Sequence, residues 1–398
     1  MKAKIALFIT QLDYGGAEKV VRILLEELKE KYDIHLILTV RLDKVMPPEG
    51  IKTLYLNEFE KTGWRNFAKI PFQSMRLKKY LEEHNIPLVF SFLLRPNLIA
   101  AFMRYLGWRG VIVLSERTSP ISFYSLQGRS GAVVLFLMKK IFPKADLIVP
   151  NSYGATYELR DSLKIKTDYQ VIYNPLDIPQ TNQRGLADLD DNYKNVINFA
   201  RFTFICVGQL HPYKNHQLLI KAFAQLSHLD CQLLIVGGGV EAENLKQQVR
   251  ELKLEERVLF VGYDANPARF MARSSCFVTA TNVEGLPNVH LEALCLGLPV
   301  ISTDCISGPR ELLAPKSNVK FSLKTGIEVA EYGILSPTND ASALATAMIR
   351  IYEDEILRQR YQKIGPVRAA DFAKPEKIAQ FVKMLDDMNE KAMQKMQA

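Results

Sequence analysis

Two glutamates, Glu284 and Glu292, stand close together in a segment that directly follows a short apolar run at 276–279. The run predicts a buried strand, so Glu284 should lie in the loop at its carboxyl end and Glu292 on the next helix. A carboxylate accepts hydrogen bonds from two hydroxyl groups at once, so the pair predicts a site that holds sugar and ribose hydroxyls. The backbone between them can meet phosphates at the helix start, through Gly285, Leu286, Pro287, Asn288 and Val289.

A lysine occupies a second loop of the same kind. Lys214 follows the apolar run 202–207 and precedes a segment of helical periodicity at 217–226, with Gln209 earlier in the loop. An ammonium group beside helix N–H groups can hold a diphosphate as a point charge. The alternative is an exposed lysine that only marks the start of a helix.

Two glycine-rich turns could bring backbone N–H groups close to a ligand. Gly15 and Gly16 follow the apolar run 5–9, where they favour an anion at a helix start or simply ease a tight turn. The glycines at 237–239 resemble the glycine-rich turn of a dinucleotide-binding motif. They follow the second strand of their domain, however, whereas that motif follows the first. A loop on the nucleotide side, with Gly238 and with Tyr263 near the base, is therefore favoured over a dehydrogenase.

The elements that must position these residues form two series in which strands alternate with helices. The expected strands are 5–9, 35–40, 88–92, 111–114, 146–149 and 170–172 in the first series, and 202–207, 232–236, 258–261, 276–279 and 300–302 in the second. This pattern predicts an α/β fold of two tandem doubly wound, Rossmann-like domains that face each other across a cleft.

The domain boundaries follow from a change in composition. Residues 1–175 should form the first domain, the polar segment 176–200 a linker, and 201–370 the second domain. Residues 317–331 read as a polar insertion and 340–363 as a long helix. A last helix at about 375–395 should pack back on the first domain.

Composition narrows the function classes. The 398 residues are 48% hydrophobic, and the five cysteines show no metal-ligand spacing, which argues against a disulfide framework or zinc site and favours a reducing cytosol. No apolar run approaches the roughly 20 residues of a membrane-spanning helix. We therefore expect no metal, no signal peptide and no transmembrane segment.

The net charge of +8 is concentrated in the first half, where residues 1–180 carry 26 basic and 18 acidic side chains. Basic and aromatic residues that suit an anionic bilayer alternate between 61 and 81, and a second basic stretch spans 89–145. A solvated basic face is the alternative, and no motif supports nucleic-acid binding. The residues expected at the membrane surface are Lys61, Trp64, Arg65, Lys69, Phe72, Arg76, Lys78 and Lys79.

Taken together, these motifs resemble a known family. A glutamate pair preceded by G-x-L-x-P-x-K at 208–214 resembles the retaining nucleotide-sugar glycosyltransferases of family four (GT4), which have the two-domain GT-B fold. The resemblance extends over essentially the whole chain. It includes the glycine pair near the N-terminus, Asn151-Ser152, Asn174-Pro175 and the run Gly308 to Glu311.

Three further phrases, at 91–97, 115–117 and 142–146, are similar to the subset that elongates polyprenyl-diphosphate-linked glycans. That subset includes the N-acetylgalactosaminyltransferases of bacterial N-glycan assembly. Strand-end positions in these phrases suggest acceptor-side residues, namely Arg95, Asn97, Glu116 and Arg117.

The resemblance implies a role for each matching residue. Glu284 would contact the donor sugar, Glu292 the ribose and Lys214 the diphosphate, while Gly16 would approach the phosphate or sugar from the other domain. One departure is Gln209, where the family usually has arginine. Lys214 would then carry more of the leaving group's charge, with helix N-termini and Arg310 as compensation.

The implied function is a retaining, metal-independent transfer of a hexosamine or hexose from a nucleotide sugar, with UDP-N-acetylgalactosamine or UDP-N-acetylglucosamine favoured. The acceptor would be a polyprenyl-diphosphate-linked glycan, and the enzyme would be cytoplasmic, peripheral on the cytosolic face of the inner membrane, without a cofactor. In this family the departing phosphate is commonly proposed to take the acceptor proton; a covalent mechanism with Glu284 as nucleophile is the alternative.

Other readings stay open. A lipopolysaccharide, capsule or other glycolipid glycosyltransferase would share these motifs, and epimerases and sugar phosphorylases use the same two-domain fold. A non-catalytic nucleotide-sugar-binding protein is a further alternative, favoured by Gln209.

Overall fold

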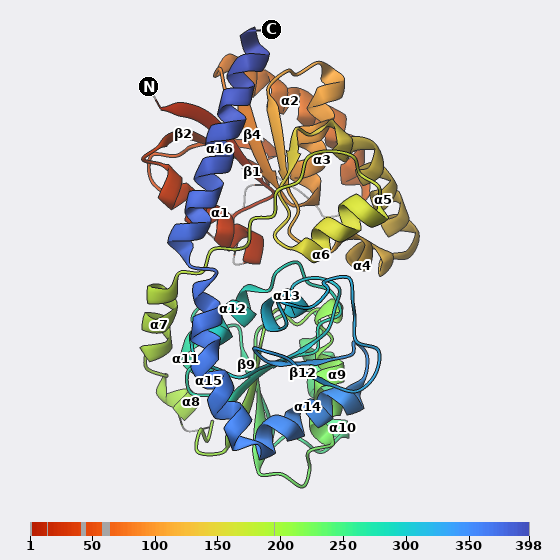
Figure 1. Cartoon of the computed structure of the whole chain (residues 1–398), viewed down its shortest axis with the longest axis vertical. Helices are drawn as coiled ribbons and strands as arrows, with labels where there is room; N and C mark the ends of the chain where they lie inside the picture. The colour runs from red at the N-terminus through yellow and green to blue at the C-terminus, as the bar shows by residue number, and fades with distance from the viewer. Residues whose placement is uncertain (1, 14, 41–44, 58–63, 195, 398) are drawn as a thin grey trace. The chain divides into compact units, whose positions relative to one another are not determined.

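The computed structural model describes residues 2–13, 15–40, 45–57, 64–194 and 196–397, with side chains at all of these except 57, 64–66, 194, 396 and 397. The chain forms two compact units (Figure 1). The first comprises residues 1–175 and 375–398, and the second comprises 176–374.

A parallel sheet with strand order β3-β2-β1-β4-β5-β6 forms the centre of the first unit. Its apolar side chains alternate between the two faces, as the pleat requires: Ala6 and Phe8 pack on one side, Ile5 and Leu7 on the other. Both faces are therefore buried. The strands are β1 (Ala3–Ile9), β2 (Tyr32–Val40), β3 (Lys52–Asn57), β4 (Leu88–Phe92), β5 (Val111–Ser115) and β6 (Leu147–Ile148).

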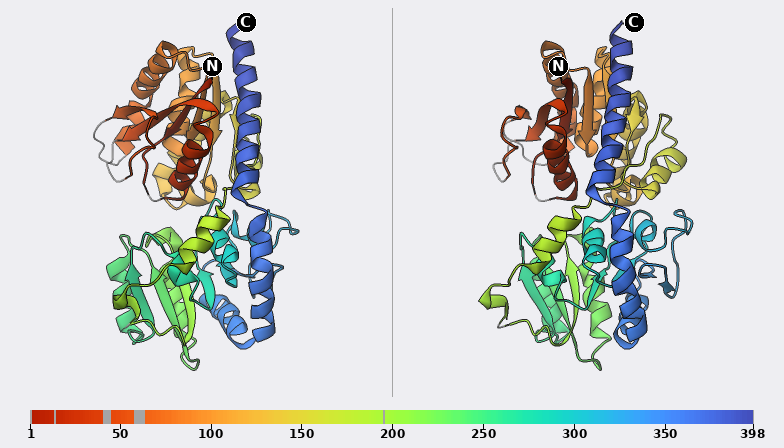
Figure 2. Two further views of the ribbon diagram at one scale, coloured as in Figure 1. Left: turned by 90° about the vertical axis from the view of Figure 1, so that its left-hand side faces the viewer. Right: turned by 60° about the vertical axis from the view of Figure 1, so that its left-hand side comes forward.

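Each face of this sheet is covered by its own layer of helices. Helices α1 (Gly16–Leu28) and α16 (Lys374–Gln397) bury their apolar sides on one face. Helices α2 (Ile70–Glu83), α3 (Leu94–Phe102) and α5 (Gly128–Ile141) cover the other. Figure 2 shows α16 running along the first unit. Shorter elements complete the unit: η1 (Trp64–Lys69), η2 (Met103–Leu106), α4 (Pro120–Ser125), η3 (Phe142–Lys144), α6 (Tyr153–Thr156) and η4 (Tyr157–Ser162).

A second sheet, with strand order β12-β13-β11-β10-β7-β8-β9, forms the centre of the second unit. All its pairings are parallel except the short antiparallel pair β12·β13. The strands are β7 (Phe202–Val207), β8 (Cys231–Val236), β9 (Val258–Gly262), β10 (Cys276–Thr279), β11 (Val300–Thr303), β12 (Glu328–Val329) and β13 (Ile334–Ser336).

Helices follow the strands of the second unit, so its loops gather at the carboxyl ends of parallel strands. These elements are α7 (Ile178–Leu186), α8 (Asp191–Lys194), η5 (Pro212–Lys214), α9 (His216–Ala224), α10 (Ala242–Glu251), α11 (Ala268–Met271), α12 (Asn288–Cys295), α13 (Pro309–Leu313), α14 (Ala341–Glu353) and α15 (Glu355–Ala370). The prediction of two parallel α/β domains is confirmed.

The structure differs from the sequence prediction in several elements. Residues 170–172 form no strand, and Tyr169 makes only an isolated bridge to Ile148. Residues 340–363 form two helices because the Asp354 carboxylate accepts from Leu357 N and starts a new one. The expected linker, 176–200, carries α7 and α8 and belongs to the second unit, and β3 and the β12·β13 pair were not predicted.

Candidate active site

Lys214 and Glu284 form an ion pair at the carboxyl edge of the second sheet. Lys214 ends η5, which follows β7, and its Nζ lies 2.5 Å from Glu284 Oε1 in the loop after β10. The two side chains are 22% and 11% exposed. Burial alone lowers the pKa of Lys214, but the Glu284 carboxylate outweighs it, so the net shift is upward. The ammonium therefore stays charged at neutral pH.

Hydrogen bonds between loops hold this pair in place. Asn282 N donates to Tyr213 O at 2.9 Å, which ties the loop after β10 to the loop of Lys214. Thr303 Oγ1 donates to Thr281 O, and Ser307 Oγ donates to Gly285 O at 2.7 Å. One backbone–backbone bond and two hydroxyl-to-carbonyl bonds thus link the loops, so the site is preorganised. Sequence reasoning did not single out these positioning residues, although each lies at a strand end.

The segment between the two glutamates leads into α12 as predicted. Gly285, Leu286 and Pro287 are buried, and Asn288 and Val289 at the start of α12 are half-buried. The first N–H groups of a helix have no intrahelical partner and can meet an anion.

Glu292 lies in the second turn of α12 and is half-buried. His290, between the glutamates, is fully buried, and its Nε2 lies 3.2 Å from Thr279 Oγ1 and 3.0 Å from Ser302 Oγ. Burial and the nearby Lys214 lower its pKa to about 3. His290 is therefore a neutral core residue.

Two of the three glycines after β8 serve close packing of loops. A Cβ on Gly237 would lie 1.9 Å from Gly208 O, and one on Gly239 would lie 2.3 Å from Leu210 O. Gly238 has more room, because its Cβ would only touch Tyr263 Cβ at 3.7 Å. The structure thus places Gly238 beside the exposed Tyr263.

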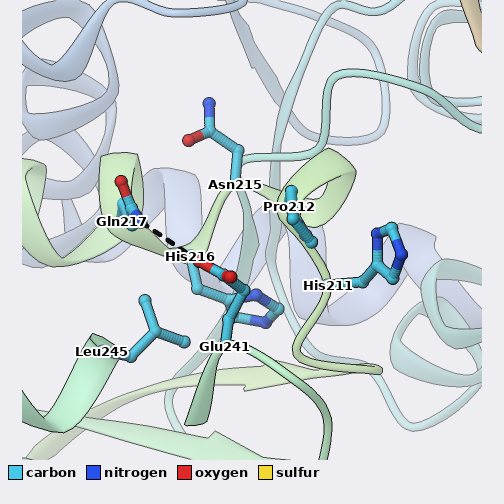
Figure 3. A pocket seen from close by; sticks show the side chains of 7 residues that line it. All are labelled: His211, Pro212, Asn215, His216, Gln217, Glu241 and Leu245. Carbon is cyan, nitrogen blue, oxygen red and sulfur yellow. Dashed lines mark hydrogen bonds between the residues drawn. The ribbon is translucent and has the colours of Figure 1, made fainter. Parts of the chain in front are cut away.

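A small cavity of about 90 Å³ lies at the start of α9 (Figure 3). Neither Lys214 nor Glu284 lines it, so it lies beside the ion pair and not at it. It is lined by His211, Pro212, Asn215, His216, Gln217, Glu241 and Leu245. Across the cavity, Gln217 Nε2 donates to Glu241 Oε2 at 3.2 Å. The ring centroids of His211 and Tyr213 lie 4.4 Å apart.

The compensation expected for Gln209 does not come from Arg310. Gln209 is exposed, but Arg310 is buried and donates to Asp304 Oδ2 at 2.6 Å, to Glu328 Oε2 at 2.8 Å and to Ser317 Oγ at 3.1 Å. These contacts commit its guanidinium to the protein interior. The expectation was wrong because the sequence does not show that Asp304 and Glu328 surround Arg310.

The glycine pair lies in the first unit. Gly15 precedes α1 and Gly16 is its first residue, and both are exposed. A Cβ on Gly15 would lie 2.2 Å from Glu18 Oε2, so the turn leaves little space there.

Of the four expected acceptor-side residues, two have structural roles within the first unit. Asn97 is fully buried, accepts from Ser91 Oγ at 2.8 Å and donates to Ser115 O at 2.9 Å, which joins β4 to β5. Arg95 donates to Gln73 Oε1 at 3.0 Å.

Glu116 and Arg117 lie together at the carboxyl end of β5. Burial raises the pKa of Glu116 to about 7. The N–H groups of Arg117 and Thr118 donate to its Oε1 and lower the pKa, but burial has the larger effect. Arg117 donates to Asn174 Oδ1 at 2.6 Å, and burial lowers its pKa to about 9. This edge therefore holds a carboxyl group that gains or loses its proton near neutral pH.

The expected membrane-surface residues lie on and before α2. Lys61 lies outside the described residues, as do the side chains of Trp64 and Arg65. Lys78 is half-buried, and the exposed members of the set are Lys69, Phe72, Arg76 and Lys79. Along the part of the chain that the structure describes, no helix combines the length and apolar character needed to cross a membrane.

Comparison with known proteins agrees with this arrangement. Residues 14–180 match the family described as Glycosyltransferase Family 4, and residues 190–368 match Glycosyl transferases group 1. The chain is 34% identical over 373 residues to the N-acetylgalactosamine-N,N'-diacetylbacillosaminyl-diphospho-undecaprenol 4-alpha-N-acetylgalactosaminyltransferase of Campylobacter jejuni, covering 93% of this chain and 96% of that protein. It is 25% identical to the N-acetyl-alpha-D-glucosaminyl L-malate synthase of Bacillus anthracis, covering 87% and 86%.

Solved structures of low identity share the fold. Sucrose-phosphate synthase from Thermosynechococcus elongatus superimposes with a TM-score of 0.81 at 20% identity, covering 97% of this chain and 99% of that one. HepE from Anabaena, solved in complex with UDP, gives 0.74 at 18% identity, covering 97% and 100%. The fold is therefore GT-B, and the chain is a glycosyltransferase that belongs to family 4.

Proposed function

We propose that this glycosyltransferase moves an N-acetylhexosamine, from UDP-N-acetylgalactosamine or UDP-N-acetylglucosamine, to a polyprenyl-diphosphate-linked glycan. The anomeric configuration is retained and no metal or other cofactor is needed. The observation that carries the proposal is the Lys214–Glu284 ion pair, preorganised at the carboxyl edge of the second sheet. The printed activity of the Campylobacter jejuni relative supports the choice of sugar and acceptor.

Lys214 holds the leaving diphosphate in this proposal. Without donor its ammonium is paired with Glu284. When donor binds, the diphosphate takes the ammonium, and the N–H groups at the start of α12 provide further positive potential. Glu284 is then released to accept hydrogen bonds from the donor sugar, and Glu292 accepts from the ribose.

The chemical step exchanges one bond at the anomeric carbon. Its bond to the diphosphate oxygen breaks, and its bond to the acceptor hydroxyl oxygen forms on the same face of the sugar. The acceptor proton passes to the departing phosphate oxygen, so no external base is needed. Glu284 positions the sugar; the alternative is a covalent intermediate on its carboxylate.

The acceptor is expected to reach the first unit from a membrane. The excess basic charge of residues 1–180 suits an anionic surface. We propose that the enzyme is cytoplasmic and works as a peripheral protein on the cytosolic face of the inner membrane. The partners are then the nucleotide sugar, the lipid-linked glycan and the anionic lipid surface.

The test incubates purified protein with UDP- and GDP-sugars, with and without polyprenyl-diphosphate-linked glycan, in the presence of EDTA. We expect nucleotide release and a mass increase of one N-acetylhexosamine on the lipid, with the donor's anomeric configuration seen by NMR. The Lys214→Ala variant serves as the inactive control. Sugar interconversion without acceptor would instead identify an epimerase, and transfer only to lipopolysaccharide would reassign the acceptor.

A single variant tests the ribose assignment. Glu292→Gln keeps the side-chain shape but removes the charge, and charged hydrogen bonds contribute about 1.5–3 kcal/mol. We expect donor affinity, measured by calorimetry, to fall by roughly 10- to 100-fold. Unchanged affinity would remove Glu292 from the ribose.

A further inference from the structure

Helix α5 exposes an apolar and basic stripe to solvent. Val133 and Phe136 are 58% and 57% exposed, and Leu126, just before the helix, is 61% exposed. Arg129 and Lys140 continue the same side at helical spacing and are also exposed. The opposite side of α5 is buried in the core through Val134, Met138 and Ile141. We name Leu126, Arg129, Val133, Phe136 and Lys140 the α5 stripe.

The stretch of sequence that contains the stripe is strongly basic. Between residues 84 and 145 the only acidic residue is the buried Glu116. Among the described residues, no carboxylate forms a salt bridge with Arg129, Lys139, Lys140 or Lys144. The Lys140 ammonium lies 5.7 Å from the centre of the Phe136 ring, and that of Lys144 lies 5.2 Å from the centre of the exposed Tyr105 ring. Cations next to exposed aromatic rings suit the boundary between headgroups and acyl chains.

The stripe belongs to the more basic of the two helix layers of the first unit. Helices α2, α3 and α5, with η2 and η3, carry nine basic and two acidic side chains, and they pack together on one sheet face. Helices α1 and α16 on the other face carry seven of each. A lipid surface that selects by charge would therefore meet the α2–α3–α5 layer.

Within that layer, α2 is less available than α5. Arg76 donates to Leu56 O at 2.6 Å, Lys78 to Leu106 O at 3.0 Å, and Lys79 lies 3.7 Å from Glu83. Although α2 exposes Phe72 and Met75, its cations already have partners within the protein. Within the described part of the chain, the α5 stripe combines exposed apolar side chains with cations that form no salt bridge to a carboxylate.

We propose that the α5 stripe inserts into an anionic lipid bilayer, with Val133 and Phe136 among the acyl chains and Arg129 and Lys140 at the phosphates. The exposed Lys139 and Lys144, which adjoin the stripe, meet phosphates as well. This deepens the proposed function, on which it rests for its membrane location. It moves the main contact from the predicted residues 61–79 to α5. It also accounts for the exposure of the large apolar side chains of Leu126, Val133 and Phe136.

The test is cosedimentation of the full-length protein with phosphatidylcholine vesicles, with or without roughly one third phosphatidylglycerol. Wild type should bind only the anionic vesicles. Val133→Asp with Phe136→Asp should lower the partition coefficient by roughly 10-fold or more, and Lys139→Glu with Lys140→Glu should do the same at low salt.

Matched controls lie elsewhere on the molecule. Ile356→Asp changes an apolar side chain that is 83% exposed on α15 of the second unit. Lys363→Glu with Lys383→Glu reverses two exposed cations on α15 and α16. Both controls should bind the anionic vesicles like wild type.

A fluorescent label on the stripe measures how deeply it enters the bilayer. All five cysteines are buried, so Phe136→Cys can be labelled selectively with an environment-sensitive dye. We expect its emission to shift to the blue and to be quenched by lipids brominated on the acyl chain. The same label at Ile356→Cys should remain in water.

Several results would overturn the proposal. The α5 variants could bind the anionic vesicles as well as wild type does. Alternatively, brominated lipids could quench a label at Phe72→Cys but not one at Phe136→Cys. Either result would contradict the proposal. Loss of membrane localisation in cells without loss of vesicle binding would assign the stripe to a protein partner.

The test of membrane insertion can be distinguished from the test of the proposed sugar transfer. Vesicle binding needs neither donor nor acceptor, so it can succeed when transfer fails. With a short-chain, water-soluble acceptor the α5 variants should transfer sugar at the wild-type rate, because the stripe lies on the opposite side of α5 from the core.

Discussion

The carboxyl edges of the two sheets use charged residues in different ways. In the second unit, Lys214 and Glu284 neutralise each other and remain partly exposed. In the first unit, Glu116 and Arg117 are buried, and among the described residues Glu116 Oε2 and Arg117 Nε have no hydrogen-bond partner. The same strand–loop–helix geometry thus supports an open, paired site in one unit and an enclosed, incompletely paired cluster in the other. Loops are cross-linked in both units, for example by Arg117 Nη2 donating to Asn174 Oδ1 in the first, so the difference lies in the side chains that the loops carry.

We call the site of Lys214 and Glu284 the open edge and that of Glu116 and Arg117 the enclosed cluster. The largest effect is expected when the ammonium group of Lys214 is removed from the open edge. Lys214→Ala should lower kcat/KM by roughly 10³-fold, because it deletes positive charge at the leaving diphosphate. Steady-state kinetics with UDP-sugar measure the change. Lys221→Ala, an exposed lysine on α9, is the matched control and should behave like wild type. A Lys214→Ala enzyme with near-normal kcat/KM would show that the pair is only structural.

The loop packing beneath the open edge can be tested by two neighbouring glycines. Gly237→Ala places a Cβ 1.9 Å from Gly208 O and should lower the free energy of unfolding by about 3 kcal/mol. The new Cβ of Gly238→Ala would lie 3.7 Å from Tyr263 Cβ, an ordinary van der Waals contact, so this variant should lose much less free energy of unfolding. Urea denaturation measures both variants. If the two are equally stable, the tight contact between the loops after β7 and β8 is not required.

The enclosed cluster should show itself in the pH dependence of stability. Its carboxyl group, Glu116, has a pKa raised from 4.5 to about 7. Between these values the folded state keeps a proton that the unfolded state releases, so stability falls as pH rises through this window. Glu116→Gln should remove this slope and raise Tm at about pH 8 by roughly 3 °C relative to wild type.

Thermal melts from about pH 5 to pH 8 check this slope. The neighbouring groups Arg117, Glu158 and Tyr124 are unchanged in the variant. Glu255→Gln, an exposed change on the other unit, should keep the wild-type slope. Parallel pH profiles for Glu116→Gln and wild type would contradict a proton held at Glu116.

The smallest effect is expected from adding a cation to the open edge. Gln209→Arg restores the residue that the family usually carries, and Gln209 is exposed, so the change should fold normally. Donor affinity should rise by roughly 3- to 10-fold, with a steeper salt dependence. Calorimetry at two salt concentrations measures it. No gain would mean that Lys214 already balances the diphosphate.

The open edge was largely predictable from the sequence, because its residues lie at strand ends that apolar runs reveal. Lys214 and Glu284 are 70 positions apart, yet both follow strands of one parallel sheet, so topology alone brings them together. The helix that carries Glu292 was likewise expected after the strand at 276–279, and the structure has it as α12.

What the sequence did not reveal depends on partners distant in the chain. The sequence leaves Arg310 available for a ligand, but in the structure Asp304 and Glu328 surround it. Asn97 looked like an acceptor-side residue, but it joins two strands. Strands β3, β12 and β13 were missed because none of them forms a continuous apolar run. Side-chain partners, unlike strand ends, are not encoded in local pattern.

The buried Arg310 has a consequence for how this enzyme can diversify. Besides its bonds to Asp304 and Glu328, the same cluster receives Leu323 N on Asp304 Oδ2 at 2.6 Å and Ser322 Oγ on Asp304 O at 2.8 Å. The polar insertion 317–331 is thus held at Ser317, Ser322, Leu323 and Glu328, whereas residues 324–326 between them are exposed. Substitutions or insertions at 324–326 are therefore expected to leave in place the strand ends that hold Lys214 and Glu284.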